Sequence, residues 1–188
     1  MLKLNADRGT LIARGPTNLG YLVAASGRAR GNNMELELAE QWMREALIEA
    51  RKAESEGEIP IGAVLLVNEK IIGRSHNSSI QLHDPTAHAE IVALRQAGRY
   101  MKNYRLPGAV LVVTIEPCVM CMGAMIHARV DEIIYGAPDP KAGGVQSRFQ
   151  LADEPQLNHK IRITSGVLEA ECSAILKDFF ASRRRINE

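Results

Sequence analysis

Two short segments of the sequence carry residue types that can bind a metal ion and move protons. His88-Ala89-Glu90 supplies an imidazole and a carboxylate, and Pro117-Cys118-Val119-Met120-Cys121 supplies two thiols. A catalytic zinc site has three protein ligands and leaves its fourth position to water, whose pKa the metal lowers toward neutrality. One imidazole, two thiolates and a spare carboxylate are therefore the groups that zinc-assisted hydrolysis requires.

The spacing of these residues indicates which of them share one metal ion. Cys118 and Cys121 are three apart, so on the first turn of a helix both sulfurs project from one face. Pro117 suits the start of such a helix, and the positive end of the helix dipole favours thiolates. His88 and Glu90 are only two apart, so they point in different directions on a helix. We therefore expect His88, Cys118 and Cys121 to bind zinc, with Glu90 as a proton carrier beside it.

The same residues are also compatible with other kinds of site. Cys118 and Cys121 alone could form a redox pair, although a third type of ligand lies upstream of them. A structural zinc site would close with a fourth Cys or His. Candidates for that fourth ligand are Cys172, His76, His83, His127 and His159. Cys172 is expected on a distant helix, and each histidine is more often a polar or packing residue. We favour the catalytic site with three ligands.

Composition places the chain among ordinary globular proteins. Its 188 residues are 46% hydrophobic and 24% charged, which suits one domain with a sizeable core. The net charge of +1 does not indicate a general nucleic-acid binder, so any such surface must be local. Three cysteines, two of them assigned to zinc, fit a reducing compartment. We see no apolar run long enough to span a bilayer and expect a cytoplasmic protein without a membrane partner.

Residues 1–33 differ from the rest of the chain and are expected to form an N-terminal extension with weak order. They hold five basic residues and one acid, with scattered glycines and no apolar period. An organellar transit segment is one interpretation, since such segments are rich in Arg and poor in acids. The others are a weakly ordered tail, or translation that begins at Met34. We favour the last two, because serine is sparse.

Residues 34–188 alternate between helical and strand patterns. This alternation predicts an α/β fold: a single three-layer domain with a mixed central sheet flanked by helices. Both metal-binding segments would then lie at strand-to-helix turns, where an open sheet forms its ligand crevice. The predicted elements are a helix along the apolar stripe of residues 39–50, a hairpin of 61–67 and 71–73, a helix capped by Thr86, a strand at 109–115 before the second metal-binding helix, strands at 131–135 and 161–164, and a final helix over 167–184.

The motifs also resemble those of a known family. H-x-E followed by P-C-x-x-C is shared by the zinc-dependent nucleobase deaminases, so it indicates only the cytidine deaminase-like superfamily. Within that superfamily, residues from about Glu35 to Arg184 resemble the bacterial tRNA-specific adenosine deaminases. The stretches that carry this resemblance are Ile59–Val64, Asp84–Glu90, Glu116–Arg129, Asn103–Leu106, Leu157–His159, and Phe179-Phe180 with Arg183-Arg184.

The resemblance implies an enzyme that hydrolyses adenosine to inosine at the wobble position of tRNA. It implies that His88, Cys118 and Cys121 hold one Zn²⁺ per subunit and that Glu90 shuttles protons. Its expected substrate is a tRNA anticodon stem-loop, with arginine tRNA as the first candidate. The family also implies a homodimer whose partner helps to form the RNA site.

Several further residues are expected to contact the substrate. By the resemblance, Asn77 contacts the target base and Asp139 lies in a loop that touches the RNA backbone, while a backbone N–H near Ala89 could hold the base edge. The candidates on the last helix are Phe180, Arg183 and Arg184. Phe180 could stack on a base, and the arginines suit phosphates. An alternative for these arginines is a solvated helix end whose cations complement the dipole.

Two rival functions use the same metal-binding residues. One is a free-base or mononucleotide deaminase, for instance one that acts on guanine, which would not need to recognise RNA. The other is a non-enzymatic zinc-binding module, which would need neither Glu90 nor an open coordination position on the metal. We expect the tRNA deaminase.

Overall fold

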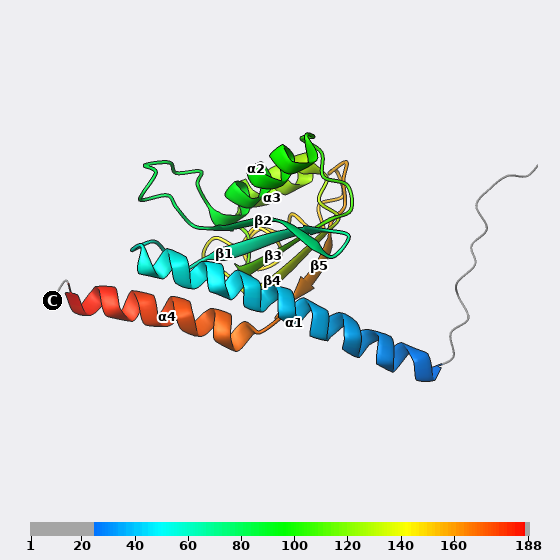
Figure 1. The fold of residues 1–188 in the computed structure, drawn as a ribbon, viewed down its shortest axis with the longest axis horizontal. Helices are drawn as coiled ribbons and strands as arrows, with labels where there is room; N and C mark the ends of the chain where they lie inside the picture. The colour runs from blue at the N-terminus through cyan, green and yellow to red at the C-terminus, as the bar shows by residue number, and fades with distance from the viewer. Residues whose placement is uncertain (1–24, 187–188) are drawn as a thin grey trace, which may run out of the picture.

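The computed structural model describes residues 25–186, which form a five-stranded mixed sheet between two pairs of helices. The strands lie in the order β2-β1-β3-β4-β5. Figure 1 shows α1 and α4 on one face of this sheet and α2 and α3 on the other. The three-layer α/β fold predicted from the sequence is thus confirmed. The strands are β1 (Gly62–Val67), β2 (Lys70–His76), β3 (Ala109–Ile115), β4 (Glu132–Ala137) and β5 (Arg162–Ser165).

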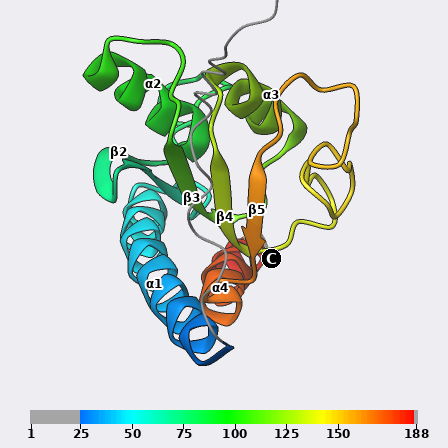
Figure 2. The same cartoon turned by 90° about the vertical axis from the view of Figure 1, so that its right-hand side faces the viewer.

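Strand direction decides where functional residues gather. β1 pairs antiparallel with both β2 and β3, whereas β3, β4 and β5 are parallel to one another. Every strand except β1 therefore points the same way, and the carboxyl ends of these four strands lie at the same end of the sheet. Figure 2 shows β3, β4 and β5 aligned side by side. Asn77 directly follows β2, Cys118 lies beyond β3, and Asp139 lies beyond β4. Residues far apart in the sequence thus reach the same edge.

Alternation along the strands separates two hydrophobic cores. On β3, Leu111 and Val113 face the core under α2 and α3, while Val112 faces the core under α1 and α4. On β4, Ile133 and Ile134 are divided between the faces in the same way. Because both faces are covered by helices, these strands read as continuous apolar runs.

The four helices cover the sheet as the periodicity predicts. They are α1 (Ala25–Ser55), α2 (Ala89–Met101), α3 (Val119–Ala128) and α4 (Glu169–Ile186). From the predicted α1 stripe, Met43, Ala46 and Ala50 are completely buried. α1 lies so close to β1 that a Cβ on Gly62 would stand 2.0 Å from the carbonyl oxygen of Ala46. Glycine at this position allows the helix to pack directly on the strand.

One predicted helix boundary is wrong. Thr86 does not cap α2; the N-cap is His88, two residues later. Thr86 instead donates its backbone N–H and its hydroxyl to Asp84 Oδ1, at 2.8 and 2.7 Å. Asp84-Pro85-Thr86 therefore forms a turn ahead of the helix, because the short Asp side chain satisfies the backbone two residues later. Pro117 likewise precedes its helix, with Cys118 as the N-cap of α3.

The predicted division at Met34 falls inside α1, whose helical backbone begins at Ala25. The extension expected over residues 1–33 thus lies mainly outside the described residues, and its role stays a prediction. Among the described residues, no helix combines the length and the apolar character needed to cross a lipid bilayer.

Candidate zinc-dependent active site

The predicted metal ligands lie at the N-termini of two neighbouring helices. His88 is the N-cap of α2 and Cys118 is the N-cap of α3, and both have extended backbone angles. Neither side chain caps its own helix by a hydrogen bond. Since α2 and α3 cover the same face of the sheet (Figure 1), these free side chains can meet in front of the two helix ends. Cys121 joins them from the first turn of α3.

The three donor atoms have the separation that one zinc ion requires. His88 Nδ1 lies 3.7 Å from Cys118 Sγ and 3.6 Å from Cys121 Sγ. Zinc–sulfur bonds of about 2.3 Å and zinc–nitrogen bonds of about 2.0 Å in a tetrahedron place such ligands roughly 3.5–3.8 Å apart. Among the described residues, these three side chains form the one group of His, Cys, Asp or Glu whose donor atoms cluster within 4.8 Å. Their chemistry and spacing fit zinc.

The residues considered as a fourth ligand lie elsewhere. Cys172 is buried in the core between α4 and the other face of the sheet. His76 contacts the carbonyl oxygen of Asn77, and His159 contacts that of Val130 at 2.7 Å. His83 and His127 have exposed side chains. Among the described residues, His88, Cys118 and Cys121 therefore form a group of three candidate ligands.

Without metal, the two thiols share a proton unequally. A hydrogen bond from Cys121 is the largest cause that lowers the pKa of Cys118 to about 4. The same hydrogen bond is the largest cause of a raised pKa at Cys121, with burial adding to it. The lowered pKa favours the thiolate of Cys118, which is the form of cysteine that binds a metal ion.

Glu90 lies in the first turn of α2, beside the ligand group, with only 3% of its surface exposed. Burial is the main cause that raises the pKa of this carboxyl. A carboxyl that holds a proton more readily than usual can accept a proton and return it in a later step.

The segment after β2 brings Asn77 to the same end of the sheet. The backbone N–H of Ser78 donates to Ala87 at 3.0 Å, and the Ser75 hydroxyl donates to the carbonyl of Ala89 at 2.6 Å. These bonds tie the end of β2 to the start of α2. Asn77 is 4% exposed and Ala89 is completely buried, so both are packed inside the protein where the end of β2 meets the start of α2.

Glu116 is a residue of this region that the sequence analysis did not single out. Its buried carboxylate accepts backbone hydrogen bonds through both oxygens: Oε1 from Val145, Gln146 and Ser147, and Oε2 from Asp139 at 3.0 Å. Burial acts to raise the pKa of this carboxyl, but these N–H groups outweigh it and the pKa is lowered.

Glu116 thereby joins the loop after β4 to the cysteine segment. A Cβ on Gly143 would come within 2.5 Å of its carboxylate, and Gly143 also forms a bridge with Cys118. The carboxylate that fixes Asp139 thus lies two residues before a ligand. In the sequence, Glu116 is visible only as an acid next to Pro117. That position does not indicate a contact with the loop at Asp139, which lies 23 residues later in the chain.

The candidate RNA contacts gather in one cleft between the loop after β4 and the end of α4. This cleft has a volume of about 540 Å³ and is lined by Asp139, Lys141, Lys177, Phe180, Arg183 and Arg184, among others. Phe180 is 45% exposed, whereas its neighbour Phe179 is buried. The structure therefore brings together four residues that the resemblance had singled out separately.

Arg183 also has partners within the protein. Its guanidinium donates to the carbonyl of Gly57 at 2.7 Å and lies over the ring of Phe179, 5.1 Å from the ring centre. Part of its role is thus to anchor the end of α4. Arg184 is exposed on the same turn.

The mixed sheet and the His-Cys-Cys group at two helix N-termini define a zinc-binding deaminase domain. Residues 36–137 match the family model described as the cytidine and deoxycytidylate deaminase zinc-binding region. The tRNA-specific adenosine deaminase of Haemophilus influenzae is 50% identical over 149 residues, 79% of this chain and 86% of the relative. That of Bacillus subtilis is 44% identical over 146 residues, 78% of this chain and 91% of the relative. The chain belongs to the tRNA-specific adenosine deaminases, a zinc enzyme family.

Solved structures agree with this assignment. A structure from a study of A-to-I editing by tRNA deaminases at the wobble position superposes with a TM-score of 0.71 at 45% identity, over 72% of this chain and 99% of that chain. The guanine deaminase of Nitrosomonas europaea superposes with a TM-score of 0.66 at 24% identity, over 76% of this chain and 84% of that chain. The second likeness shows the fold alone.

Replacing a ligand should remove the metal, whereas replacing the third cysteine should not. We expect Cys118→Ser to purify with far less than one equivalent of zinc and to unfold at lower temperature, because ligand binding is coupled to folding. Cys172→Ser is the matched control, since its thiol lies on the opposite face of the sheet. Metal analysis and thermal denaturation measure both effects. One equivalent of zinc in Cys118→Ser would contradict the ligand set.

The Glu116→Gln variant should loosen the loop after β4. An amide has only one acceptor oxygen, so its NH₂ group must face other N–H donors. These are either the N–H of Asp139 or those of residues 145–147. We expect a loss of about 1–3 kcal/mol in the free energy of unfolding, measured by urea denaturation with zinc present. Glu132→Gln is the control, because that carboxylate pairs with an exposed arginine on β5. Equal losses in both variants would show that Glu116 has no special role.

Proposed function

We propose that this chain deaminates adenosine to inosine at the wobble position of a tRNA anticodon. The observation that carries the proposal is a group of three side chains fit to hold zinc, together with a cleft of cationic and aromatic side chains. The cleft residue Asp139 is bound by Glu116, two residues before Cys118. The close relatives named tRNA-specific adenosine deaminase support the same substrate. The reaction consumes one water and releases one ammonia for each inosine formed.

In this proposal, His88, Cys118 and Cys121 hold a single zinc ion. Bound zinc makes water a strong nucleophile near neutral pH. Glu90 accepts a proton from that water and delivers it to N1 of adenine, which makes C6 more electrophilic. The water oxygen bonds to C6, and Glu90 then takes the remaining proton of that oxygen and delivers it to the amino group. The C6–N bond breaks, ammonia leaves, and C6 keeps the oxygen. One buried carboxyl performs both transfers, because its raised pKa suits acid and base roles alike.

Asn77 and the first turn of α2 are proposed to hold the target base. Asn77 is fixed at the end of β2, and the N–H groups of the first helical turn have no partner within the helix. Ala89 is the first residue of that turn. A side-chain amide and a free backbone N–H can together recognise the edge of a base that has left its stack.

The surrounding RNA is proposed to bind along the cleft beside α4. The bases of an anticodon loop are single-stranded, so the target base can turn outward at low cost. Phe180 is placed to stack on a neighbouring base, while Arg183 and Arg184 face phosphates. Asp139 lines the same cleft and is proposed to lie beside the RNA backbone near the target base. Arginine tRNA is the substrate we would test first.

The assembly and location follow as further proposals. A groove of about 820 Å³ runs along α2 and α3, and the exposed Tyr104 lies on it, with Tyr100 exposed near the end of α2. A second copy of the chain would cover these aromatic rings in the homodimer that the family resemblance implies. A tRNA-modifying enzyme of this kind would act in the cytoplasm.

Substrate tests separate this function from its rivals. The zinc-loaded protein should convert adenosine to inosine in an arginine tRNA anticodon stem-loop and release ammonia, but should leave free adenosine and free guanine unchanged. Glu90→Gln should retain one equivalent of zinc and lose turnover by at least about a thousandfold, as expected for removal of a proton-transfer group. Activity on free guanine alone would favour the free-base deaminase. No activity with any base would favour a non-catalytic zinc module.

Cationic contacts should appear in the salt dependence of binding. We expect Arg184→Ala to weaken stem-loop binding and to reduce the slope of log affinity against log salt by roughly one. Arg162→Ala is the control, because Arg162 begins β5 at the end of the sheet opposite the site and pairs with Glu132. Fluorescence anisotropy over a salt series measures both. An unchanged slope in Arg184→Ala would place the phosphates elsewhere.

A further inference from the structure

Glu58 is a completely buried acid that the proposed reaction does not use. It follows the turn after α1, in which Gly57 has φ of 78° and the Glu58 N–H donates to the carbonyl of Ala53. This helix end turns the Glu58 side chain into the protein. None of the ion pairs formed among residues 35–184 includes it. A buried carboxylate without a cation is costly unless hydrogen bonds compensate it.

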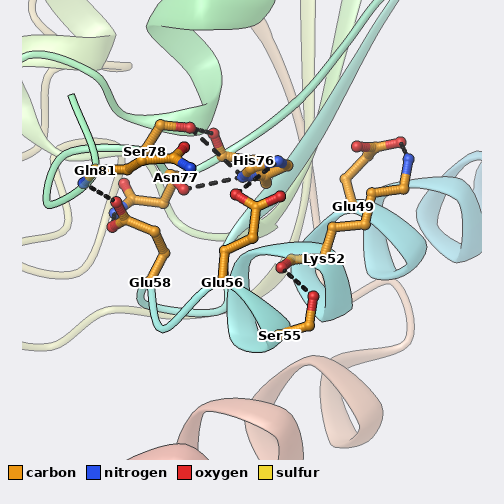
Figure 3. A network of polar contacts seen from close by, with 9 residues as sticks. All are labelled: Glu49, Lys52, Ser55, Glu56, Glu58, His76, Asn77, Ser78 and Gln81. Atoms are coloured by element: carbon orange, nitrogen blue, oxygen red, sulfur yellow. Dashed lines mark hydrogen bonds and ion pairs between the residues drawn. The ribbon is translucent and has the colours of Figure 1, made fainter.

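Both compensating hydrogen bonds come from the segment that carries the substrate residues. Oε2 accepts from Asn77 Nδ2 at 3.2 Å, and Oε1 accepts from the backbone N–H of Gln81 at 2.8 Å. Figure 3 shows the Glu58 carboxylate facing Asn77 and Gln81. One carboxylate therefore spans the start and the middle of the loop between β2 and α2.

An ionised carboxylate can only accept hydrogen bonds, whereas a side-chain amide has one donor end and one acceptor end. Glu58 therefore forces Asn77 to turn its NH₂ group inward and leaves Oδ1 directed away from Glu58. We propose that Glu58 is a positioning residue that sets the orientation of the Asn77 amide, and hence which hydrogen-bonding pattern the target base meets. This inference rests on the proposed function of Asn77.

A neighbouring acid shows what a purely structural carboxylate looks like in this protein. Glu49 on α1 is also buried, at 4% exposure, but it pairs with Lys52 one turn along the same helix, at 2.8 Å. Figure 3 shows this pair apart from the contacts of Glu58. Glu49 has a local cation and no hydrogen bond to the substrate loop, so Glu49→Gln is a matched control.

The first experiment compares Glu58→Gln with Glu49→Gln in the zinc-loaded enzyme. An NH₂ group at position 58 cannot accept a hydrogen bond from Asn77 Nδ2. The Asn77 amide can therefore turn over and present Oδ1 to position 58. We expect kcat/KM on the stem-loop to fall roughly 10- to 100-fold in Glu58→Gln, with one equivalent of zinc retained, and to stay near wild type in Glu49→Gln. An inactive wild type would refute the proposed function. An active wild type with fully active Glu58→Gln would refute the role of Glu58 alone.

A double-mutant cycle tests whether Glu58 acts through Asn77. If it does, Glu58→Gln should have almost no further effect on kcat/KM in an Asn77→Ala background, because the group it orients is gone. A merely structural role would lower activity by the same factor in both backgrounds. That additive result would overturn the proposal.

Stability supplies a test that holds even if Glu58→Gln folds less well than wild type. Asn77→Asp places two carboxylates against each other, so it should lower the melting temperature. Adding Glu58→Gln to that variant should raise the melting temperature again, because the new amide can donate to the new carboxylate. Glu58→Gln would thus destabilise wild type but stabilise Asn77→Asp. The same sign in both backgrounds would show that the two side chains do not control each other.

Discussion

The packing of α2 and α3 side by side on one face of the sheet is the constraint on which the site depends. Each helix begins with a metal-ligand candidate at its N-cap, and His88 and Cys118 leave their own helices uncapped so that they can meet. The positive ends of two helices then surround two thiols and a carboxyl, and such ends favour anionic groups. If either helix were shifted along the sheet, the separations of 3.6 and 3.7 Å between His88 Nδ1 and the sulfurs would be lost.

Three buried carboxylates around this centre show how environment assigns different tasks to one chemical group. Glu90 has burial as its dominant influence, so it holds a proton more readily than usual. Glu116 is surrounded by backbone N–H groups, so it stays ionised and organises the loop after β4. Glu58 has two donors, both from the loop after β2. The first can move a proton, whereas the other two fix the loops on either side.

The single antiparallel strand between β2 and β3 explains how these parts share one edge. Because β1 runs opposite to both neighbours, β2 and β3 point the same way and their carboxyl ends lie on the same side. The base-contacting candidate Asn77, the ligand Cys118 and the loop residue Asp139 therefore approach from three strands. α4 then closes the far side of the cleft with Phe180 and its arginines.

The sequence by itself determined the metal chemistry and most of the fold, because those depend on local spacing. The place of Cys118 and Cys121 at the start of one helix and the strand at 109–115 were predicted correctly, as was the three-layer architecture. The N-cap at Thr86 was wrong, since Asp84 satisfies that residue in a turn and the helix starts at His88. Only the tertiary structure revealed Glu58 and Glu116, because each carboxylate meets donors about 20 to 30 residues away in the chain. Spacing along the chain records which side chains share a helical turn, whereas contacts between strand ends exist only after the sheet has formed.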